Sequence, residues 1–416
     1  MPVARVWAGH PVGFSLLTAP PRQFVAFYDD ERRMIAGQRE LDSAEWAFIT
    51  LPETVGWDSH NSIFMTQDAA GHIHLAGNMH VHPLRYFRTE TPDDITTLVR
   101  VEAMTGDEED RVTYPRFFTG PDGALLFSYR DGGSGRGNEI INRYDTETRA
   151  WSRLLDVPLV DGEGVRNAYF DGPRLGPDGY FHMCWVWRDT PDCETNHSLS
   201  YARSRDMVNW ERSDGTPFDL PITFATSEVV DPVPPGGGLI NGNARLGFDR
   251  EQRPLITYHK HDDAGNTQIH IARLESGEWV RRRITDWDYR WDFSGRGTII
   301  FEIRLLGGAR SVEGHIEQTY QHDAKGNGRL RLDPETLAIV DQLPPTEPIQ
   351  PRHLRGPQSD FPGMQVRWRS DSGRAEPANA RYFLRWETLG ANRDRPRDPP
   401  LPEPSQLMLY RFETGR

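Results

Sequence analysis

The sequence contains few cysteines and no long apolar segment, and these absences exclude several classes of protein. Its 416 residues include only Cys184 and Cys193, so at most one disulfide bond can form and a disulfide-stabilised scaffold is excluded. No apolar run approaches the ~18 residues that a membrane span requires, so we expect no membrane association. The first residues, MPVARVWAGHPVGF, lack a basic segment followed by an apolar one, so we expect no signal peptide and a cytoplasmic location.

Positive charge is also scarce. Lys and Arg number 48 against 61 Asp and Glu, and the formal net charge is −13. Non-specific nucleic-acid binding needs a basic field, so nucleic acid is excluded as a partner. An acidic ligand remains compatible with this balance, because a local basic pocket can lie within an acidic protein. We expect a monomer or a weak oligomer.

Helical periodicity is weak, and the segment PDDITTLVRVEAM (92–104) is the one short helix that the pattern predicts. The chain holds 38 Gly and 32 Pro, which indicates many turns. A strand, an Asp/Gly turn and a second strand recur in four segments, 62–78, 116–130, 173–188 and 244–260. A further copy is expected at 12–29. The turn aspartates are Asp68, Asp122, Asp178 and Asp249.

Each hairpin is followed by a second pair of strand-like segments, as in 141–154, 199–213 and 269–284. Four strands in each unit are typical of a propeller blade, and the chain length accommodates six to seven such units. We therefore predict an all-β protein, a seven-bladed β-propeller whose single domain covers residues 1–416. A pair of β-sandwiches is the alternative. The Pro- and Arg-rich segment 391–405 is predicted to be a solvated loop.

Polar side chains concentrate at two positions of the repeated hairpin. Residues just before its first strand and at the end of its second strand meet at one face, because the strands are antiparallel. Loop faces of rigid scaffolds commonly carry function. These positions hold His60, Asn61, Asn78, His80, Tyr114, Arg130, Tyr169, Arg188, Asn241, His259 and Lys260.

This set of His, Tyr, Arg and Lys suits β-elimination on a uronic acid. Arginine can pair with the sugar carboxylate and stabilise the charge that develops when the C5 proton leaves. A base near neutrality takes that proton, and an acid protonates the O4 leaving group. A neighbouring guanidinium is expected to favour the phenolate of Tyr114. A glycosidase needs a carboxylate pair, for which only Asp58 and Asp131 flank the set.

Three motifs make the sequence recognisable. The segments DSHNSIF…GHIHLAGNMHVHPLRYF, VTYPRFFTGPDGALLFSYRDGGSGRGN and WRDTPDCETNHSLSYARSRDMVNW resemble the seven-bladed propeller polysaccharide lyases, which include ulvan lyases and L-rhamnose-α-1,4-D-glucuronate lyases. The resemblance covers roughly residues 1–340, and its specific motifs lie between 57 and 210. His60 and His80 stand twenty residues apart, and Tyr114 and Arg130 sixteen, as in that family. The segment from His80 to Tyr114 is shorter than the family pattern.

The resemblance implies a role for each predicted residue. Arg130, with Asn78 or His60, would neutralise the carboxylate, while Tyr114 and His80 would share the base and acid roles. The implied substrate is an acidic oligosaccharide or polysaccharide with a rhamnose-α-1,4-glucuronate type linkage. No catalytic metal or cofactor is implied, although a structural calcium ion is compatible. The residues expected to hold the sugar are Asn61, Asn78, Tyr169, Arg188, Asn196, His197, Asn241, His259 and Lys260.

Two other functions remain open. The segment AGHPVGFSLL with His10 resembles propeller α-L-rhamnosidases, which hydrolyse the same linkage. A non-catalytic propeller that binds a glycan is the second alternative. Retention of the whole His, His, Tyr and Arg set favours the lyase.

Overall fold

The computed structural model describes residues 1–413 and consists of β-strands joined by turns. The strands form six hydrogen-bonded sheets. The first two contain β2 (Ser15–Ala19), β3 (Arg22–Tyr28), β4 (Arg33–Glu40) and β5 (Ala47–Thr54), and then β6 (Ile63–Gln67), β7 (Ile73–Gly77), β9 (Tyr86–Thr89) and β10 (Leu98–Val101). The third contains β8 (His80–His82), β11 (Val112–Thr119), β12 (Leu125–Gly133), β13 (Arg136–Asp145) and β14 (Ala150–Arg153).

The remaining three sheets are also built from antiparallel strands, apart from one parallel pair in the eight-stranded sheet. The fourth contains β15 (Asn167–Leu175), β16 (Phe181–Arg188), β17 (Asn196–Ser204), β18 (Trp210–Glu211) and β19 (Glu228–Asp231). The fifth contains β20 (Arg245–Phe248), β21 (Pro254–His261), β22 (Thr267–Glu275), β23 (Glu278–Arg283), β24 (Ile303–Val312), β25 (His315–His322), β26 (Gly328–Leu332) and β27 (Ile339–Leu343). The last contains β28 (Met364–Ser370), β29 (Ala380–Leu389), β30 (Ser405–Glu413) and β1 (Pro2–Val6).

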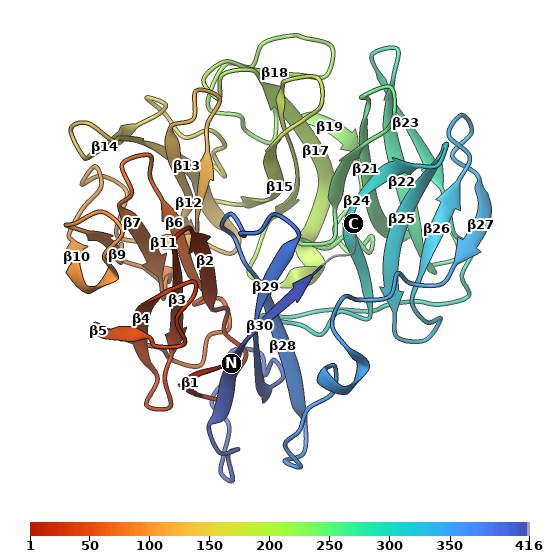
Figure 1. Cartoon of the computed structure of the whole chain (residues 1–416). Helices are drawn as coiled ribbons and strands as arrows, with labels where there is room; N and C mark the ends of the chain where they lie inside the picture. The colour runs from red at the N-terminus through yellow and green to blue at the C-terminus, as the bar shows by residue number, and fades with distance from the viewer. Residues whose placement is uncertain (414–416) are drawn as a thin grey trace.

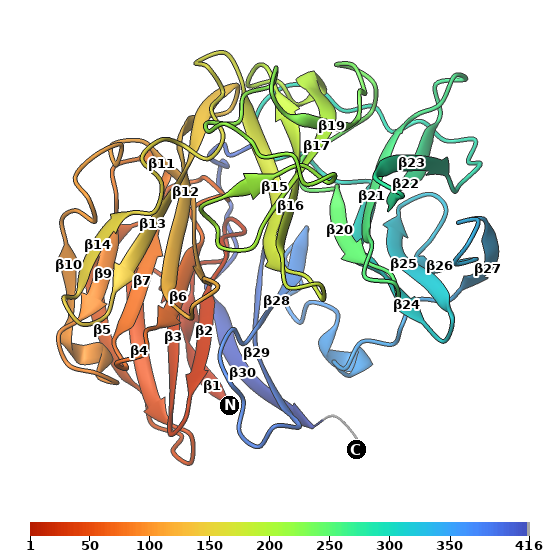
Figure 2. The same ribbon diagram turned by 90° about the horizontal axis from the view of Figure 1, so that it is seen from above.

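The sheets succeed one another around a common centre, so the prediction of an all-β propeller is confirmed (Figure 1, Figure 2). First strands of neighbouring units contact one another, as β2 does with β6 and with β28. The eight-stranded sheet joins two four-stranded antiparallel units through one parallel pair, Phe248 and Arg310. If the eight-stranded sheet is divided at this parallel pair, the described chain contains seven units of four or five strands.

The two ends of the described chain share one sheet. β1 pairs antiparallel with β30, and the α-amino group of Met1 donates to the carbonyl of Leu409 at 2.7 Å. The last unit therefore takes its outermost strand from the beginning of the chain. This pairing covers an edge that would otherwise be exposed, which is how propellers protect their sheets.

The repeated turn aspartates have one structural cause. The Asp68 carboxylate accepts hydrogen bonds from the backbone of Ala70 and His72 at 2.9 and 2.8 Å, and Asp249 accepts one from Arg253 at 2.9 Å. Asp122 and Asp178 bond the backbone two residues on in the same way. A short acceptor at this position stabilises the tight turn, which explains why the sequence repeats it.

Buried side chains fill the space between the sheets. β16 is buried along its whole length and includes Trp185 and Trp187, both fully inaccessible. Burial on both faces is expected for a strand packed between two neighbouring sheets. Cys184 and Cys193 are both buried free thiols.

The predicted helix at 92–104 is wrong. The segment forms a short 3-10 turn, Ile95–Thr97, capped by the Asp94 side chain, and then strand β10. The β-branched residues that follow the turn favour a strand. Two further 3-10 turns occur at Cys193–Thr195 and Arg352–Leu354. Within residues 1–413, no helix has the length and apolarity needed to cross a membrane.

Candidate active site

Three separate segments bring together a carboxylate, two imidazoles and a phenol. Asp58 and His60 lie in the loop before β6, His80 begins β8, and Tyr114 lies in β11. The ring centroids of His60 and His80 are 4.3 Å apart, and each lies 5.6–5.7 Å from the Tyr114 ring. The predicted clustering of these three residues is therefore what the structure shows, and together with Asp58 they form the candidate active site.

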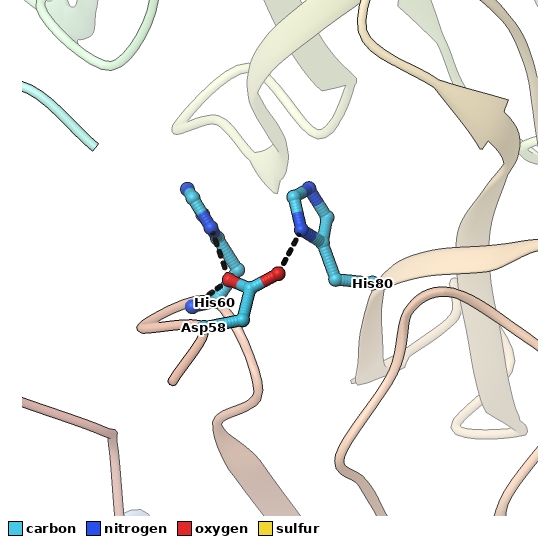
Figure 3. A group of neighbouring side chains, drawn as sticks. All are labelled: Asp58, His60 and His80. Atoms are coloured by element: carbon cyan, nitrogen blue, oxygen red, sulfur yellow. Dashed lines mark hydrogen bonds and ion pairs between the residues drawn. The ribbon is translucent and has the colours of Figure 1, made fainter. Parts of the chain in front are cut away.

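The Asp58 carboxylate lies between the two histidines (Figure 3). Its Oδ1 is 2.6 Å from Nδ1 of His60, and its Oδ2 is 2.5 Å from Nδ1 of His80. Burial by itself would raise the pKa of Asp58, but hydrogen bonds from both histidines outweigh burial and hold the pKa well below its ordinary range. Asp58 is therefore ionised at neutral pH, and both histidines carry their proton on Nδ1 and direct Nε2 away from the carboxylate.

Unusual backbone conformations deliver His80 and Tyr114 to this cluster. Asn78, Val81 and Tyr114 have φ angles of 60°, 60° and 53°, in the left-handed region that is strained for a residue with a side chain. Tyr114 lies where the pairing of β11 with β12 shifts register between Thr113 and Arg116. Such bulges redirect a side chain near active sites, and strained residues concentrate at functional sites.

Asp58, His60 and His80 also have the ligand types of a metal site. One ligand atom of each residue lies within 4.8 Å of the others. Histidine and carboxylate ligands suit zinc and other transition metals. Both Nδ1 atoms, however, are already bonded to the single carboxylate, which leaves the two Nε2 atoms as the imidazole nitrogens that face other groups.

Two arginines and a second tyrosine adjoin Tyr114. The guanidinium carbon of Arg130 lies 4.9 Å from the ring centre of Tyr114 and 5.2 Å from that of Tyr169. Arg188 lies 5.7 Å from the Tyr169 ring centre and its Nη1 is 3.4 Å from the Tyr169 hydroxyl. Both amino nitrogens of Arg130 are buried without a hydrogen-bond partner. An unpaired buried guanidinium is costly and therefore favours a negative charge nearby.

The pKa values of Tyr114 and Tyr169 are shifted in opposite directions. Burial raises the pKa of Tyr114, and the adjacent Tyr169 raises it further, so that Arg130 and Arg188 cannot offset the rise. Burial would also raise the pKa of Tyr169, but the positive charges of Arg130 and Arg188 outweigh burial and lower it. The expectation that a guanidinium favours the Tyr114 phenolate is thus corrected. Tyr114 remains protonated at neutral pH, and Tyr169 is the phenol whose pKa the arginines lower.

Two cavities adjoin these groups. The active-site cavity, of 170 Å³, is lined by His60, His80, Tyr114, Tyr169, Arg188, Asn241 and the segment 296–299, with Ser134 and Asp394 at its border. The inner cavity, of 440 Å³, is lined by Arg130, Glu139 and residues of the first strands, and shares His60, Tyr114, Tyr169 and Asn241 with the active-site cavity. Arg188 thus faces the active-site cavity, whereas Arg130 lies behind the two tyrosine rings.

Four of the predicted sugar-binding residues have other partners. The Asn78 amide donates to Glu53 at 2.9 Å, Lys260 pairs with Asp231 at 2.6 Å, and His197 bonds Asp189 at 3.0 Å. His259 packs against Trp291 with its ring centroid 5.2 Å away. None of the four lines either cavity. We omit them from the proposed site, because these contacts already occupy their side chains and none of them reaches a cavity wall.

Two predicted asparagines support the site from behind. Asn196 is fully buried, and its amide donates to Asn241 Oδ1 at 3.2 Å and to the Cys193 carbonyl at 2.6 Å. It therefore orients Asn241 and has no surface for a sugar. Asn61 is also buried and lines neither cavity, and its carbonyl accepts a hydrogen bond from Tyr28.

The buried His259 predicts acid sensitivity. Burial lowers its pKa to about 3. Between that value and the ordinary value near 6.5, the unfolded chain binds the proton and the folded chain does not. Above pH ~6.5 the histidine is neutral in both states and does not reduce the unfolding free energy. As the pH falls below that value, the unfolding free energy decreases by up to about 1.4 kcal/mol per pH unit. When the pH is lowered from about 7 to about 4.5, the unfolding free energy should decrease in both proteins. The decrease should be about 2 kcal/mol smaller in His259→Phe than in the unsubstituted chain.

Urea unfolding at the two pH values measures this difference. His353→Phe replaces an exposed histidine and is the matched control, which should behave like the unsubstituted chain. Equal pH dependence in all three proteins would contradict the assignment.

Sequence reasoning did not assign the roles of several residues in or beside the active-site cavity. Asp58 precedes His60 by two residues and could have been identified from the segment DSH, since carboxylates commonly orient histidines. Thr298 and Asp394 carried no such signal. Thr298 Oγ1 bonds both Asp394 and Ser59, and lies 3.4 Å from Nε2 of His60. Asp394 belongs to the segment predicted to be a solvated loop, part of which instead reaches the cavity.

The chain is similar in sequence to known ulvan lyases. The chain is 37% identical over 238 residues to the short isoform of ulvan lyase from Alteromonas sp. (strain LOR), which is 50% of this chain and 45% of that protein. It is 50% identical over 147 residues to a long isoform of ulvan lyase from Alteromonas sp., covering 32% of this chain and 14% of that protein. The matches therefore span less than half the length of these relatives.

Solved structures share the fold at low sequence identity. A polysaccharide lyase named Uly1 aligns over 97% of this chain and 90% of its own, with a TM-score of 0.60 and 15% identity. A structure described as a PL25 ulvan lyase aligns over 99% and 95%, with a TM-score of 0.61 and 12% identity. The BNR repeat-containing family matches residues 22–287, which is more than half of the chain. This protein therefore belongs to the BNR repeat-containing family and has the propeller fold of the ulvan lyases.

Proposed function

We propose that this protein is a polysaccharide lyase that breaks the bond to O4 of a uronic acid by β-elimination. The observation that carries the proposal is the carboxylate-bridged histidine pair beside a protonated tyrosine, with two arginines on the adjoining tyrosine. The curated relatives named above are ulvan lyases, which supports the same reaction class.

The base of the proposed reaction is His80. Its Nδ1 proton is held by Asp58, so Nε2 carries a lone pair that can accept the C5 proton of the sugar. The C5–H electrons form the C4=C5 double bond as the C4–O4 bond breaks. Asp58 stabilises the imidazolium that results. His60 Nε2 faces Thr298 instead and is better placed to bind the sugar than to take the proton.

The acid of the proposed reaction is Tyr114. Its phenol is protonated at neutral pH, since an ordinary tyrosine pKa lies near 10 and burial raises that of Tyr114 further, so it can donate its proton to the departing O4. Arg188 lines the active-site cavity and supplies positive charge for the uronate carboxylate, and Arg130 adds charge from behind the tyrosine rings. Asn241 completes the cavity on the side of Arg188, to which its Oδ1 is 3.5 Å away.

The proposed substrate carries a rhamnose-α-1,4-glucuronate type linkage. One of the structures with this fold is described as an ulvan lyase bound to -[GlcA(1-4)Rha3S]-. The chemistry derived above requires only that the sugar in the cavity have a carboxylate on C5 and a leaving group on C4.

The products distinguish this reaction from its alternatives. Incubation with rhamnosyl-glucuronate oligosaccharides should produce an unsaturated uronate, seen as new ultraviolet absorbance, and no incorporation of oxygen-18 from labelled water by mass spectrometry. Incorporation of the label without new absorbance would identify a hydrolase, as expected for an α-L-rhamnosidase. Binding without any product would identify a glycan-binding propeller.

We further propose that the reaction requires no metal ion. The Nδ1 atoms of His60 and His80 are held by Asp58, and positive charge is already supplied by arginine. Treatment with EDTA followed by gel filtration should therefore leave kcat/KM within about twofold of its starting value. Loss of activity that Zn²⁺ restores would contradict this prediction and assign a metal to Asp58, His60 and His80.

A further inference from the structure

A second cavity rich in arginine lies beside the active-site cavity. This arginine cavity has a volume of 620 Å³ and lies between β24 and β28. It shares Thr298, Ile299 and Phe301 with the active-site cavity, so the segment 298–301 separates the two. Ser59 lines the arginine cavity and bonds Thr298 through its hydroxyl at 2.6 Å.

Three arginines line this cavity without any negative counter-charge. Arg304, Arg367 and Arg369 have no carboxylate oxygen within 4.0 Å in the described part of the chain. Many arginines of this acidic protein lie within 4.0 Å of a carboxylate, as Arg329 and Arg331 do with Glu317 on the neighbouring strands. The guanidinium cluster is therefore a local excess of positive charge in a protein of net charge −13.

The hydrogen bonds of these arginines are also incomplete. Nη2 of Arg367 donates to Gln365 at 3.0 Å, but its Nε is buried without a partner. Burial lowers the pKa of Arg367 and Arg369, and the charge of Arg304 lowers that of Arg367 further. An anion would offset the repulsion between these positive charges and accept hydrogen bonds from their unused N–H donors. Arginine binds such anions through paired N–H groups.

The remaining walls suit a sugar. Trp368, Phe301 and Gln365 line the same cavity and offer aromatic and amide surface. Aromatic side chains provide apolar contact for sugar rings, and an amide can bond hydroxyl groups.

We propose that Arg304, Arg367 and Arg369 form a subsite for a sulfate ester or carboxylate on a sugar next to the one that occupies the active-site cavity. This inference rests on the proposed function, since it takes the ligand of both cavities to be one acidic glycan. The shared wall at 298–301 places the two cavities side by side, so that neighbouring sugars of one glycan could occupy them.

The test compares sulfated and desulfated oligosaccharides of the same rhamnosyl-glucuronate backbone. Their binding to the full chain carrying Tyr114→Phe is measured by isothermal titration calorimetry, so that neither ligand is consumed. Adding Arg367→Gln and Arg369→Gln together should weaken binding of the sulfated ligand about tenfold or more, because charge-assisted hydrogen bonds are lost. Binding of a ligand that lacks sulfate in this subsite should change less.

Two further variants make the result interpretable. Arg304 is exposed, so Arg304→Gln should fold normally and still weaken binding of the sulfated ligand. Arg250→Gln removes an exposed arginine from a hairpin turn that lines none of the three cavities, and should have no effect. Unchanged affinity in all the cavity variants would overturn the proposal.

Other outcomes separate the subsite from the lyase activity. Arginine-dependent binding of the glycan without any unsaturated product would support the subsite and contradict the proposed lyase reaction. Normal turnover with unaltered binding in the arginine variants would support the lyase reaction and contradict the subsite. If inorganic sulfate alone shows the arginine dependence and the oligosaccharide does not, the cavity binds free anions and the glycan subsite is overturned.

Discussion

Replacing Tyr114 with phenylalanine should lower kcat on rhamnosyl-glucuronate oligosaccharides by about 10²–10⁴-fold, the usual effect of removing a general acid. The substitution removes only the hydroxyl that would protonate the departing O4, while the ring keeps its contacts with His60, His80 and Arg130. Substrate affinity should therefore change little. The initial rate of absorbance increase measures turnover, and calorimetry measures affinity.

The comparison variants assign the two phenols. Tyr169→Phe retains the Tyr114 hydroxyl but removes the phenol whose pKa Arg130 and Arg188 lower, so it should reduce turnover less than Tyr114→Phe. Tyr180→Phe, in a β-hairpin away from both cavities, is the matched control and should retain full activity. If Tyr169→Phe were inactive and Tyr114→Phe retained more than a tenth of the rate, the acid role would belong to Tyr169.

Asp58→Asn should lower kcat by roughly 10⁴-fold, comparable to the same substitution of the orienting aspartate in a Ser-His-Asp triad. The amide cannot accept hydrogen bonds from both Nδ1 atoms, so the proton of His80 can move to Nε2 and remove the lone pair that the C5 proton needs. The imidazolium formed in the reaction also loses its counter-charge. Initial rates across a pH series measure the effect.

Rescue by a second carboxylate distinguishes this positioning role from simple loss of structure. Asp58→Glu keeps an acceptor for the Nδ1 protons of the histidines and should retain more of the rate than Asp58→Asn. Asp178→Asn is the matched control. It removes a similarly exposed carboxylate from His182, 24% exposed against 26% for Asp58, and lies outside the cavities. An Asp58→Glu variant no more active than Asp58→Asn would contradict the positioning role.

The sequence alone predicted the repeating unit and much of the candidate active site. Hairpin repeats arise from local physics, because a turn aspartate, alternating side chains and strand length are encoded within about 17 residues of each copy. His60, His80 and Tyr114 could be grouped because equivalent positions of repeated hairpins meet at one face of a propeller. The same rule also included His259 and Lys260, which line neither cavity, since His259 packs against Trp291 and Lys260 pairs with Asp231.

Only the tertiary structure decided the electrostatics and the neighbours from distant segments. That Asp58 bridges both histidines, that the pKa of Tyr114 is raised while that of Tyr169 is lowered, and that Asp394 and Thr298 reach the cavity all depend on burial and on contacts between residues far apart in the chain. Charge at a site depends on every group within a few ångströms, whatever its sequence distance. Local patterns specify the strands, whereas the placement of charge between them is determined only when all the sheets close around one axis.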